Sequence, residues 1–212
     1  MNKLALVALL VPLAIAACDD PAKNKPQATV SSVVAAPPPP PSAGVVTTYA
    51  IAPPSSKVEW TGSKVTGHHD GSFGTFSGAI TFDGSIEKST VSIDIDTTTI
   101  TTTPDMLLTH LKSPDFFDVQ KYPKAQFVST SIKAGGADGA THTVTGNLDL
   151  HGVKKSITFP ATITVVGDAV DAAATFSINR KDFGINYAGK ANDLIRDEVV
   201  MKLTIHGEKK KS

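Results

Sequence analysis

Residues 89–99 read STVSIDIDTTT, and this stretch decides the fold class. Val91, Ile93 and Ile95 alternate with polar residues along it. Successive side chains of a β-strand point to opposite faces, so this alternation predicts a strand with one apolar face and one wet face.

The same two-residue period returns in three later stretches, 157–165, 170–178 and 199–205. A fourth stretch, 144–150, keeps the period but is interrupted by Gly146. A glycine inside a strand is typical of a bend or a bulge, which a curled sheet needs.

Turn-forming pairs such as Asp83-Gly84 and Gly167-Asp168 separate the alternating stretches. The strands that these patterns predict cover residues 57–67, 71–82, 89–99, 124–133, 141–150, 153–166, 170–180 and 196–207. Eight strands are enough to close a barrel, and closure removes exposed sheet edges. The sequence therefore predicts an all-β fold, an extended eight-stranded antiparallel barrel.

One interval, 103–122, breaks the strand period. Thr103 is expected to cap a helix that has Pro104 at its first position, and residues 113–115 repeat the start signal. We therefore expect one or two short helices at residues 104–119, whose apolar side closes one end of the barrel.

The N-terminus has the composition of an export signal. A short positive start is followed by an apolar run over 4–17, which is too short for a transmembrane span of about 20 residues. The run ends in IAAC (15–18), which resembles the lipobox of bacterial lipoproteins, where the cysteine sulfur receives a diacylglyceryl group. Residues 1–17 are thus expected to form a lipoprotein signal peptide, with lipidation at Cys18. The alternative is an ordinary signal peptide with Cys18 as an incidental thiol.

A diacylglyceryl group supplies the two acyl chains that stable membrane attachment needs. Asp19 and Asp20 follow Cys18 and resemble the signal that keeps a lipoprotein at the inner membrane of enteric-type bacteria. The chain is therefore expected to be exported and held as a lipoprotein on the periplasmic face of a bacterial membrane, at the inner membrane.

Composition divides the remaining chain into three parts. Residues 18–46 are rich in proline, with an unbroken run at 37–41, and are expected to be a disordered linker that favours polyproline II. Residues 47–209 have the length of one domain, and 210–212 form a short tail. With 20 basic and 20 acidic residues the chain has no net charge, which argues against a nucleic-acid partner.

Four segments, 60–84, 110–130, 146–161 and 178–199, resemble the hallmark segments of the YceI-like family, and the likeness runs in unbroken order from about residue 50 to residue 207. The resemblance implies a lipocalin-like barrel whose apolar tunnel holds a polyisoprenoid or a similar long-chain amphiphilic lipid. Isoprenoid quinone is among the implied ligands, and no covalent cofactor is implied. A cytochrome b561-type membrane protein and a second copy of the chain, in a homodimer, are the implied protein partners.

One region departs from the family pattern. Many relatives carry an arginine-aspartate pair ahead of the His-Leu motif, whereas Pro104, Asp105 and Met106 occupy that region here. If the arginine orients a headgroup in those relatives, this chain must do so otherwise or prefer another headgroup.

Large apolar side chains are the candidates for ligand binding, since an eight-stranded barrel has room for one small ligand. Some are expected in the wall and others, from 107–117, at the mouth. The candidates are Trp60, Phe73, Phe76, Ile80, Phe82, Leu107, Leu108, Leu111, Phe116, Phe117, Phe159, Phe176 and Phe183.

Residues suited to catalysis or metal binding form no recognised motif, so we expect a binding protein rather than an enzyme, and no metal site. His68-His69-Asp70 is interpreted as a polar turn, because adjacent strand residues point to opposite faces. Two alternatives stay open. One is a stress-response or structural lipoprotein whose barrel is packed shut, and the other is an enzyme that acts on a lipid headgroup through His110, Asp115 or Asp118.

Overall fold

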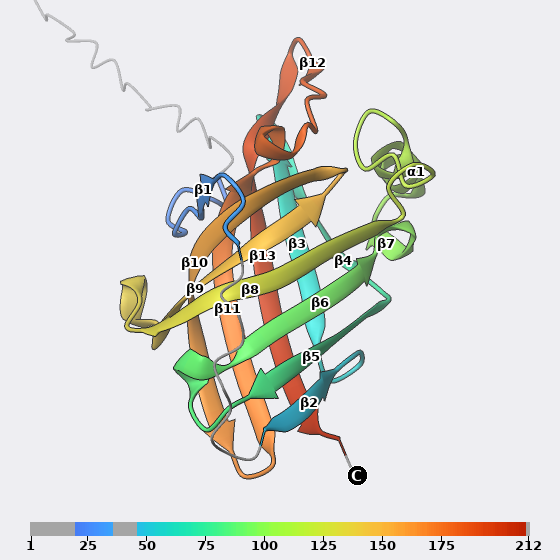
Figure 1. Ribbon diagram of the computed structural model, residues 1–212. Helices are drawn as coiled ribbons and strands as arrows, with labels where there is room; N and C mark the ends of the chain where they lie inside the picture. Colours follow the sequence, from blue (N-terminus) through green and yellow to red (C-terminus); the bar gives the residue numbers. More distant parts are fainter. Residues whose placement is uncertain (1–19, 36–45, 211–212) are drawn as a thin grey trace, which may run out of the picture.

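The computed structural model describes residues 20–35 and 46–210, which form β-strands and a single α-helix (Figure 1). The strands are β1 (Thr29–Ser31), β2 (Thr47–Ile51), β3 (Lys57–Lys64), β4 (Gly67–Phe73), β5 (Phe76–Phe82), β6 (Thr90–Asp96), β7 (Ile100–Thr102), β8 (Lys124–Ala134), β9 (His142–Leu150), β10 (Val153–Val166), β11 (Ala169–Asn179), β12 (Gly189–Lys190) and β13 (Asp193–Lys209). The α-helix is α1 (Asp105–Lys112), and short 3-10 turns lie at Ile86–Lys88, Thr97–Thr99, Ala137–Gly139 and Arg180–Phe183. The expected signal peptide, Cys18 and the proline run at 37–41 lie outside the described residues.

Eight strands close a ring in the order β10-β9-β8-β6-β5-β2-β13-β11, and β11 returns to β10. Every neighbouring pair in this ring is antiparallel. The predicted eight-stranded antiparallel barrel is therefore confirmed. Apolar side chains from both halves of the ring meet inside it and form the core.

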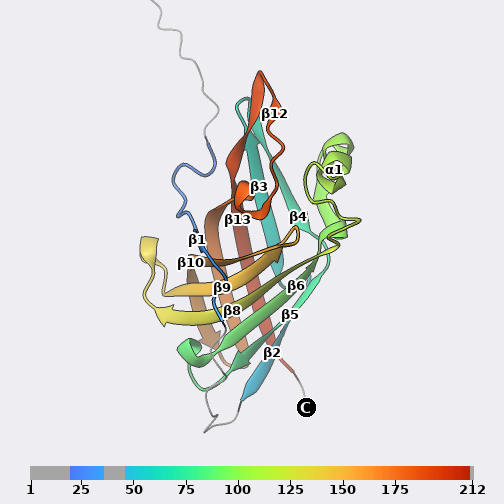
Figure 2. The same ribbon diagram turned by 45° about the horizontal axis from the view of Figure 1, so that its top comes forward.

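The long strand β13 joins the two ends of the barrel. Its C-terminal residues Gly207–Lys209 pair with β2, while Val199 to Thr204 pair with β3. From β3 the sheet continues through β4 to β7 and builds up the wall at the end where α1 and β12 lie (Figures 1 and 2). The barrel is therefore extended along β13 toward this end.

The alternating stretches fold as strands with their apolar residues inward, although several boundaries differ from the prediction. The expected strand 71–82 divides into β4 and β5, because the backbone of Gly74 and Thr75 turns to hydrogen-bond with Thr99. β2 lies outside the predicted strands. Gly146 faces a register shift in the partner strand β8, between Ser129 and Ser131, so the bulge lies across from the glycine.

The interval 103–122 contains one helix. Pro104, not Thr103, is the N-cap of α1, and it makes no side-chain capping bond, so the expected cap was wrong. The second start signal produces a hydrogen-bonded turn in which the carbonyl of Ser113 accepts from the N–H groups of Phe116 and Asp118. Helix and turn together lie over one end of the barrel (Figure 2).

The expectation of a linker over residues 18–46 was wrong for residues 20–35. β10 and β11 pair only between residues 162–166 and 169–173, and beyond this hairpin the two strands diverge. Residues 26–31 fill the resulting seam, because β1 pairs with β10 while Pro26 and Ala28 exchange backbone hydrogen bonds with Ser177. This N-terminal segment is part of the barrel wall.

Candidate functional site

A cavity of about 670 Å³ lies inside the barrel, lined by nearly all of the ring strands and by α1. Along β13 its lining extends from Asp193 to Ile205, which is about 40 Å of strand at roughly 3.3 Å per residue. Most of the lining side chains are aliphatic or aromatic. The barrel is therefore hollow, with a long apolar interior.

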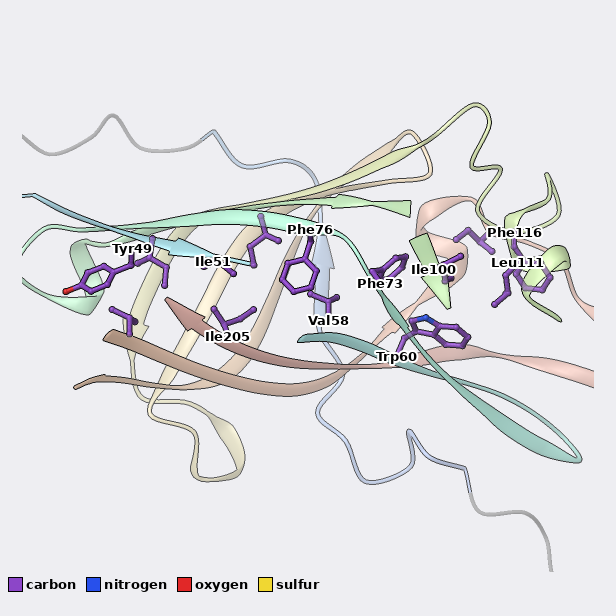
Figure 3. Close-up of a cluster of buried hydrophobic side chains, with 14 residues drawn as sticks. Tyr49, Ile51, Val58, Trp60, Phe73, Phe76, Ile100, Leu111, Phe116 and Ile205 are labelled. Carbon is purple, nitrogen blue, oxygen red and sulfur yellow. The ribbon is translucent and has the colours of Figure 1, made fainter. Parts of the chain in front are cut away.

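Most of the residues predicted to contact a ligand line this cavity. Those that do are Trp60, Phe73, Ile80, Phe82, Leu107, Leu111, Phe116, Phe117, Phe159 and Phe176. Residues from the two ends of the barrel thus share one cavity. Figure 3 shows a cluster of buried hydrophobic side chains that includes some of the lining residues, with Trp60, Leu111 and Phe116 toward one end and Ile205 toward the other.

Three of the predicted residues are not part of the cavity lining. Phe183 is fully buried and belongs to the core cluster of β8–β11, and Phe76 is buried in the core cluster around β2, β3 and β5. Leu108 is half-buried on α1 and packs against the same cluster as Phe76. Their contacts are with the protein's own core.

Sequence reasoning named the large aromatic candidates but omitted most of the aliphatic lining. The omitted residues include Val58, Val91, Ile93, Ile95, Ile132, Val144, Leu148, Leu150, Ile157, Ile163, Val170, Ala172, Ala174, Ile178, Val199, Met201, Leu203 and Ile205. The period-two pattern already carried this signal, because most of these residues are the apolar members of alternating stretches.

The cavity opens between α1 and the β12 turn. The exposed residues Met106 and Lys190 both belong to its lining at this end. Across the opening, the ring of His110 lies edge-on to Phe116 and Tyr187, with centroids 4.9 and 4.8 Å apart. Aromatic side chains from α1, the following turn and the segment before β12 therefore form the mouth.

Three buried polar atoms near this end have no hydrogen-bond partner: Nε1 of Trp60, Oγ of Ser63 and Nε of Arg196. All three residues line the cavity. Leaving a buried polar group unpaired costs about 1–3 kcal/mol, so these atoms mark a place where a ligand atom would be stabilised.

Arg180 is a charged residue of the same region, and its side chain is only 5% exposed. Its guanidinium donates to the carbonyls of Arg196, Ile185 and Ile195 and lies 3.2 Å from a carboxylate oxygen of Asp197. Burial lowers the pKa of Arg180, and the charge of Asp197 opposes that shift. The buried guanidinium therefore holds the loop at the barrel end from inside.

The enzyme alternative rested on His110, Asp115 and Asp118. Nε2 of His110 lies 2.9 Å from Oδ2 of Asp115, and His110 lines the cavity whereas neither aspartate does. Within residues 20–35 and 46–210, no three His, Cys, Asp or Glu side chains are grouped to hold a metal ion. In the same ranges, no helix has the length and hydropathy to cross a membrane.

Comparison with known proteins identifies relatives of the whole barrel. The YceI-like domain model matches residues 49–208. A UPF0312 protein of Pseudomonas putida (strain W619) is 36% identical over 148 residues, which cover 66% of this chain and 74% of that protein. A UPF0312 protein of Pseudomonas syringae pv. tomato is 34% identical over 150 residues, with the same shares.

Solved structures resemble the fold. BcnA from Burkholderia cenocepacia superposes with a TM-score of 0.63 at 26% identity, over 71% of this chain and 95% of BcnA. A polyisoprenoid binding domain from Saccharophagus degradans superposes with a TM-score of 0.61 at 17% identity, over 76% of this chain and 99% of that domain. At that identity the second likeness concerns the fold alone.

Proposed function

The chain belongs to the YceI-like domain family, and from this premise we propose that it is a lipid-binding protein that holds a polyisoprenoid or similar amphiphile in its barrel. One observation carries the proposal: an apolar cavity of about 670 Å³ that opens between α1 and β12. Pockets of 300–1,000 Å³ lined by apolar side chains are the usual size for one bound small molecule. The protein would bind the lipid without changing it covalently.

The energetics of the tail support a carrier or a buffer. Removing a methylene from water contributes about 0.8 kcal/mol, so one five-carbon isoprene unit contributes roughly 3–4 kcal/mol. A lipid in a bilayer is already out of water, and its transfer into an apolar tunnel is therefore nearly balanced. Reversible exchange with a membrane follows from this balance.

The unpaired polar atoms support a headgroup that accepts hydrogen bonds. The indole N–H of Trp60 is a donor only, and the hydroxyl of Ser63 can also donate. A quinone carbonyl accepts but does not donate, so an isoprenoid quinone fits this donor pair. If the arginine-aspartate pair of many relatives orients a headgroup, these two side chains would take that role here.

The proposed location is the periplasmic face of a bacterial membrane, at the inner membrane. It rests on the lipobox-like IAAC sequence and on the aspartates that follow Cys18. Cys18 would carry the diacylglyceryl anchor, and a cytochrome b561-type membrane protein would be an exchange partner for a bound quinone.

The two alternatives have less support. A packed-shut barrel would leave no cavity of this size. An enzyme that uses His110 with Asp115 has a hydrogen-bonded pair at the mouth, but neither Asp115 nor Asp118 belongs to the cavity lining. A binding role needs neither carboxylate.

Native mass spectrometry of the exported full-length chain, followed by organic extraction, tests the proposal. We expect a stoichiometric long-chain isoprenoid in the extract. Ala172→Phe should abolish its retention, because Ala172 lines the cavity, whereas Ala79→Phe should retain it, because Ala79 does not. An unliganded mass, with no uptake of added quinone or polyprenol, would favour the structural lipoprotein.

A further inference from the structure

The described chain begins at the mouth end of the barrel. A carboxylate oxygen of Asp20, Oδ2, lies 3.3 Å from Nη1 of Arg196. Arg196 lines the cavity together with Asp193 and Ile195, its neighbours on β13. In both views the start of the described segment lies at the end of the barrel that carries β12 (Figures 1 and 2).

The position of Asp20 does not depend on this ion pair alone. A few residues later Pro26 and Ala28 bond to Ser177 at 2.9 and 2.8 Å, and β1 pairs with β10. A partly exposed ion pair contributes at most about 1 kcal/mol, but backbone hydrogen bonds hold residues 26–31 in the seam between β10 and β11. The start of the described chain is therefore fixed against the wall of the mouth.

Exposed apolar side chains lie around the same end. Val65 is 55% exposed and Leu194 is 50% exposed, and the N–H of Val65 donates to the carbonyl of Leu194 at 3.1 Å. Met106 on α1, which is 83% exposed, belongs to the cavity lining at the opening. These three residues are here called the mouth rim.

Exposed apolar side chains occur at both ends of the barrel, so exposure alone does not distinguish the mouth end from the other end. Val165 and Val166, in the β10–β11 hairpin, are also exposed, and that hairpin pairs with the C-terminal end of β13. The start of the described chain distinguishes the two ends, because it lies at the mouth rim and far from this hairpin.

We propose that the mouth rim is a docking surface for the lipid bilayer, so that the tunnel opens directly onto the membrane. This inference rests on the proposed lipidation of Cys18. Asp20 is the second residue after Cys18, and two residue steps span at most about 7 Å of extended chain. The anchor would thus hold the mouth rim against the membrane, instead of suspending the barrel on a long linker. An amphiphile then passes between bilayer and tunnel without exposing its chain to water.

Site-specific fluorescence on the lipidated full chain tests this arrangement. The sequence has one cysteine, Cys18, so after lipidation a newly introduced cysteine is the only free thiol. Val65→Cys and Leu194→Cys report the mouth rim, and Val166→Cys, at 61% exposure in the wild type, is the matched control at the other end. Each variant carries an environment-sensitive fluorophore and is reconstituted into vesicles of phosphatidylethanolamine and phosphatidylglycerol with brominated acyl chains.

We expect quenching about threefold stronger at positions 65 and 194 than at 166, because interfacial side chains enter the boundary between headgroups and acyl chains. Inserting ten Gly and Ser residues between Asp19 and Asp20 adds about 17–19 Å of flexible reach, and should reduce this difference while the chain still floats with the vesicles. Equal quenching at the three positions would overturn the proposal, as would an insertion variant with unchanged quenching.

Flotation and ligand extraction are scored separately from quenching. A chain that does not float with the vesicles overturns the anchor and, with it, the docking surface. A chain that floats and yields a bound isoprenoid, but shows equal quenching, overturns only the docking surface and leaves the lipid-binding function intact.

Discussion

A Cβ atom on Gly71 would lie 2.2 Å from Cζ2 of Trp60 and 2.2 Å from the carbonyl oxygen of Thr101. The indole therefore lies directly against the bare backbone of β4, and the absence of a side chain at Gly71 sets the position of Trp60 at the cavity wall. No real Cβ approaches its neighbours so closely, so any larger residue must displace the ring or the strand β7.

Gly71→Ala is predicted to destabilise the protein by about 1–3 kcal/mol, the usual cost of overpacking a core. Because the ring of Trp60 must move, ligand retention should fall as well. The matched control is Gly67→Ala on the same strand, where an added Cβ meets nothing within 4 Å. Urea denaturation of both variants measures the difference, and equal midpoints would contradict the prediction.

Ser63→Ala and Ser56→Ala should have opposite consequences. Ser63 Oγ is buried without a partner, so its removal should leave the unliganded stability unchanged or slightly raised and should weaken retention of a quinone. Ser56 Oγ donates to the carbonyl of His206 at 3.2 Å and accepts from its N–H at 2.9 Å. Ser56→Ala should therefore lower the free energy of unfolding by about 1–2 kcal/mol and leave quinone retention unchanged. Loss of stability in Ser63→Ala would indicate a structural role instead.

Two basic side chains, buried Arg180 and exposed Lys181, form ion pairs with the carboxylate of Asp197. Arg180 reaches Asp197 from the interior, whereas Lys181, which is 47% exposed, reaches it at 2.9 Å from the surface. Arg180→Lys should destabilise the protein by about 2–4 kcal/mol. A single ammonium group cannot donate hydrogen bonds to the three backbone carbonyls as effectively as the guanidinium does. Lys181→Ala should change the stability by less than about 0.5 kcal/mol. Similar losses in the two variants, measured by thermal unfolding, would contradict this difference.

Asp193 should contribute to the acid sensitivity of the mouth. The hydrogen bond from Lys64, aided by Thr66, lowers the pKa of Asp193 below its ordinary value of 3.8. Because the pKa is lowered in the folded state, ionised Asp193 stabilises the fold. This stabilisation is fully present above pH 3.8 and is lost as the pH falls through the folded-state pKa. Asp193→Asn should therefore be less stable than the wild type at pH 7 and lose less stability below pH 4. Urea midpoints at a series of pH values test this, and parallel acid profiles would count against it.

The barrel was predictable from local sequence because period-two alternation reports which face of each strand is buried. Its large aromatic lining followed for the same reason. Phe76 and Phe183 were misplaced because alternation tells inside from outside but does not tell a packed core from an open lumen. That distinction depends on how neighbouring strands diverge, which is a property of the whole ring.

The N-terminal segment shows a second limit of local reasoning. Pro26 and the residues around it have the composition of a linker, and their order comes from a seam that exists only where β10 leaves β11. The unpaired Nε1 of Trp60 could not be predicted from the sequence either, since no sequence pattern reveals which buried donors lack a hydrogen-bond acceptor.

The last strand has a consequence for how the protein matures. β13 pairs with β2, β3, β11 and β12, and in the ring β2 and β11 are joined only through β13. A chain synthesised from its N-terminus thus has no enclosed lumen until β13 is available, and such distant pairings fold slowly. Lipid capture must follow the synthesis of β13, and a truncation that removes β13 would leave an open sheet with its apolar face in water.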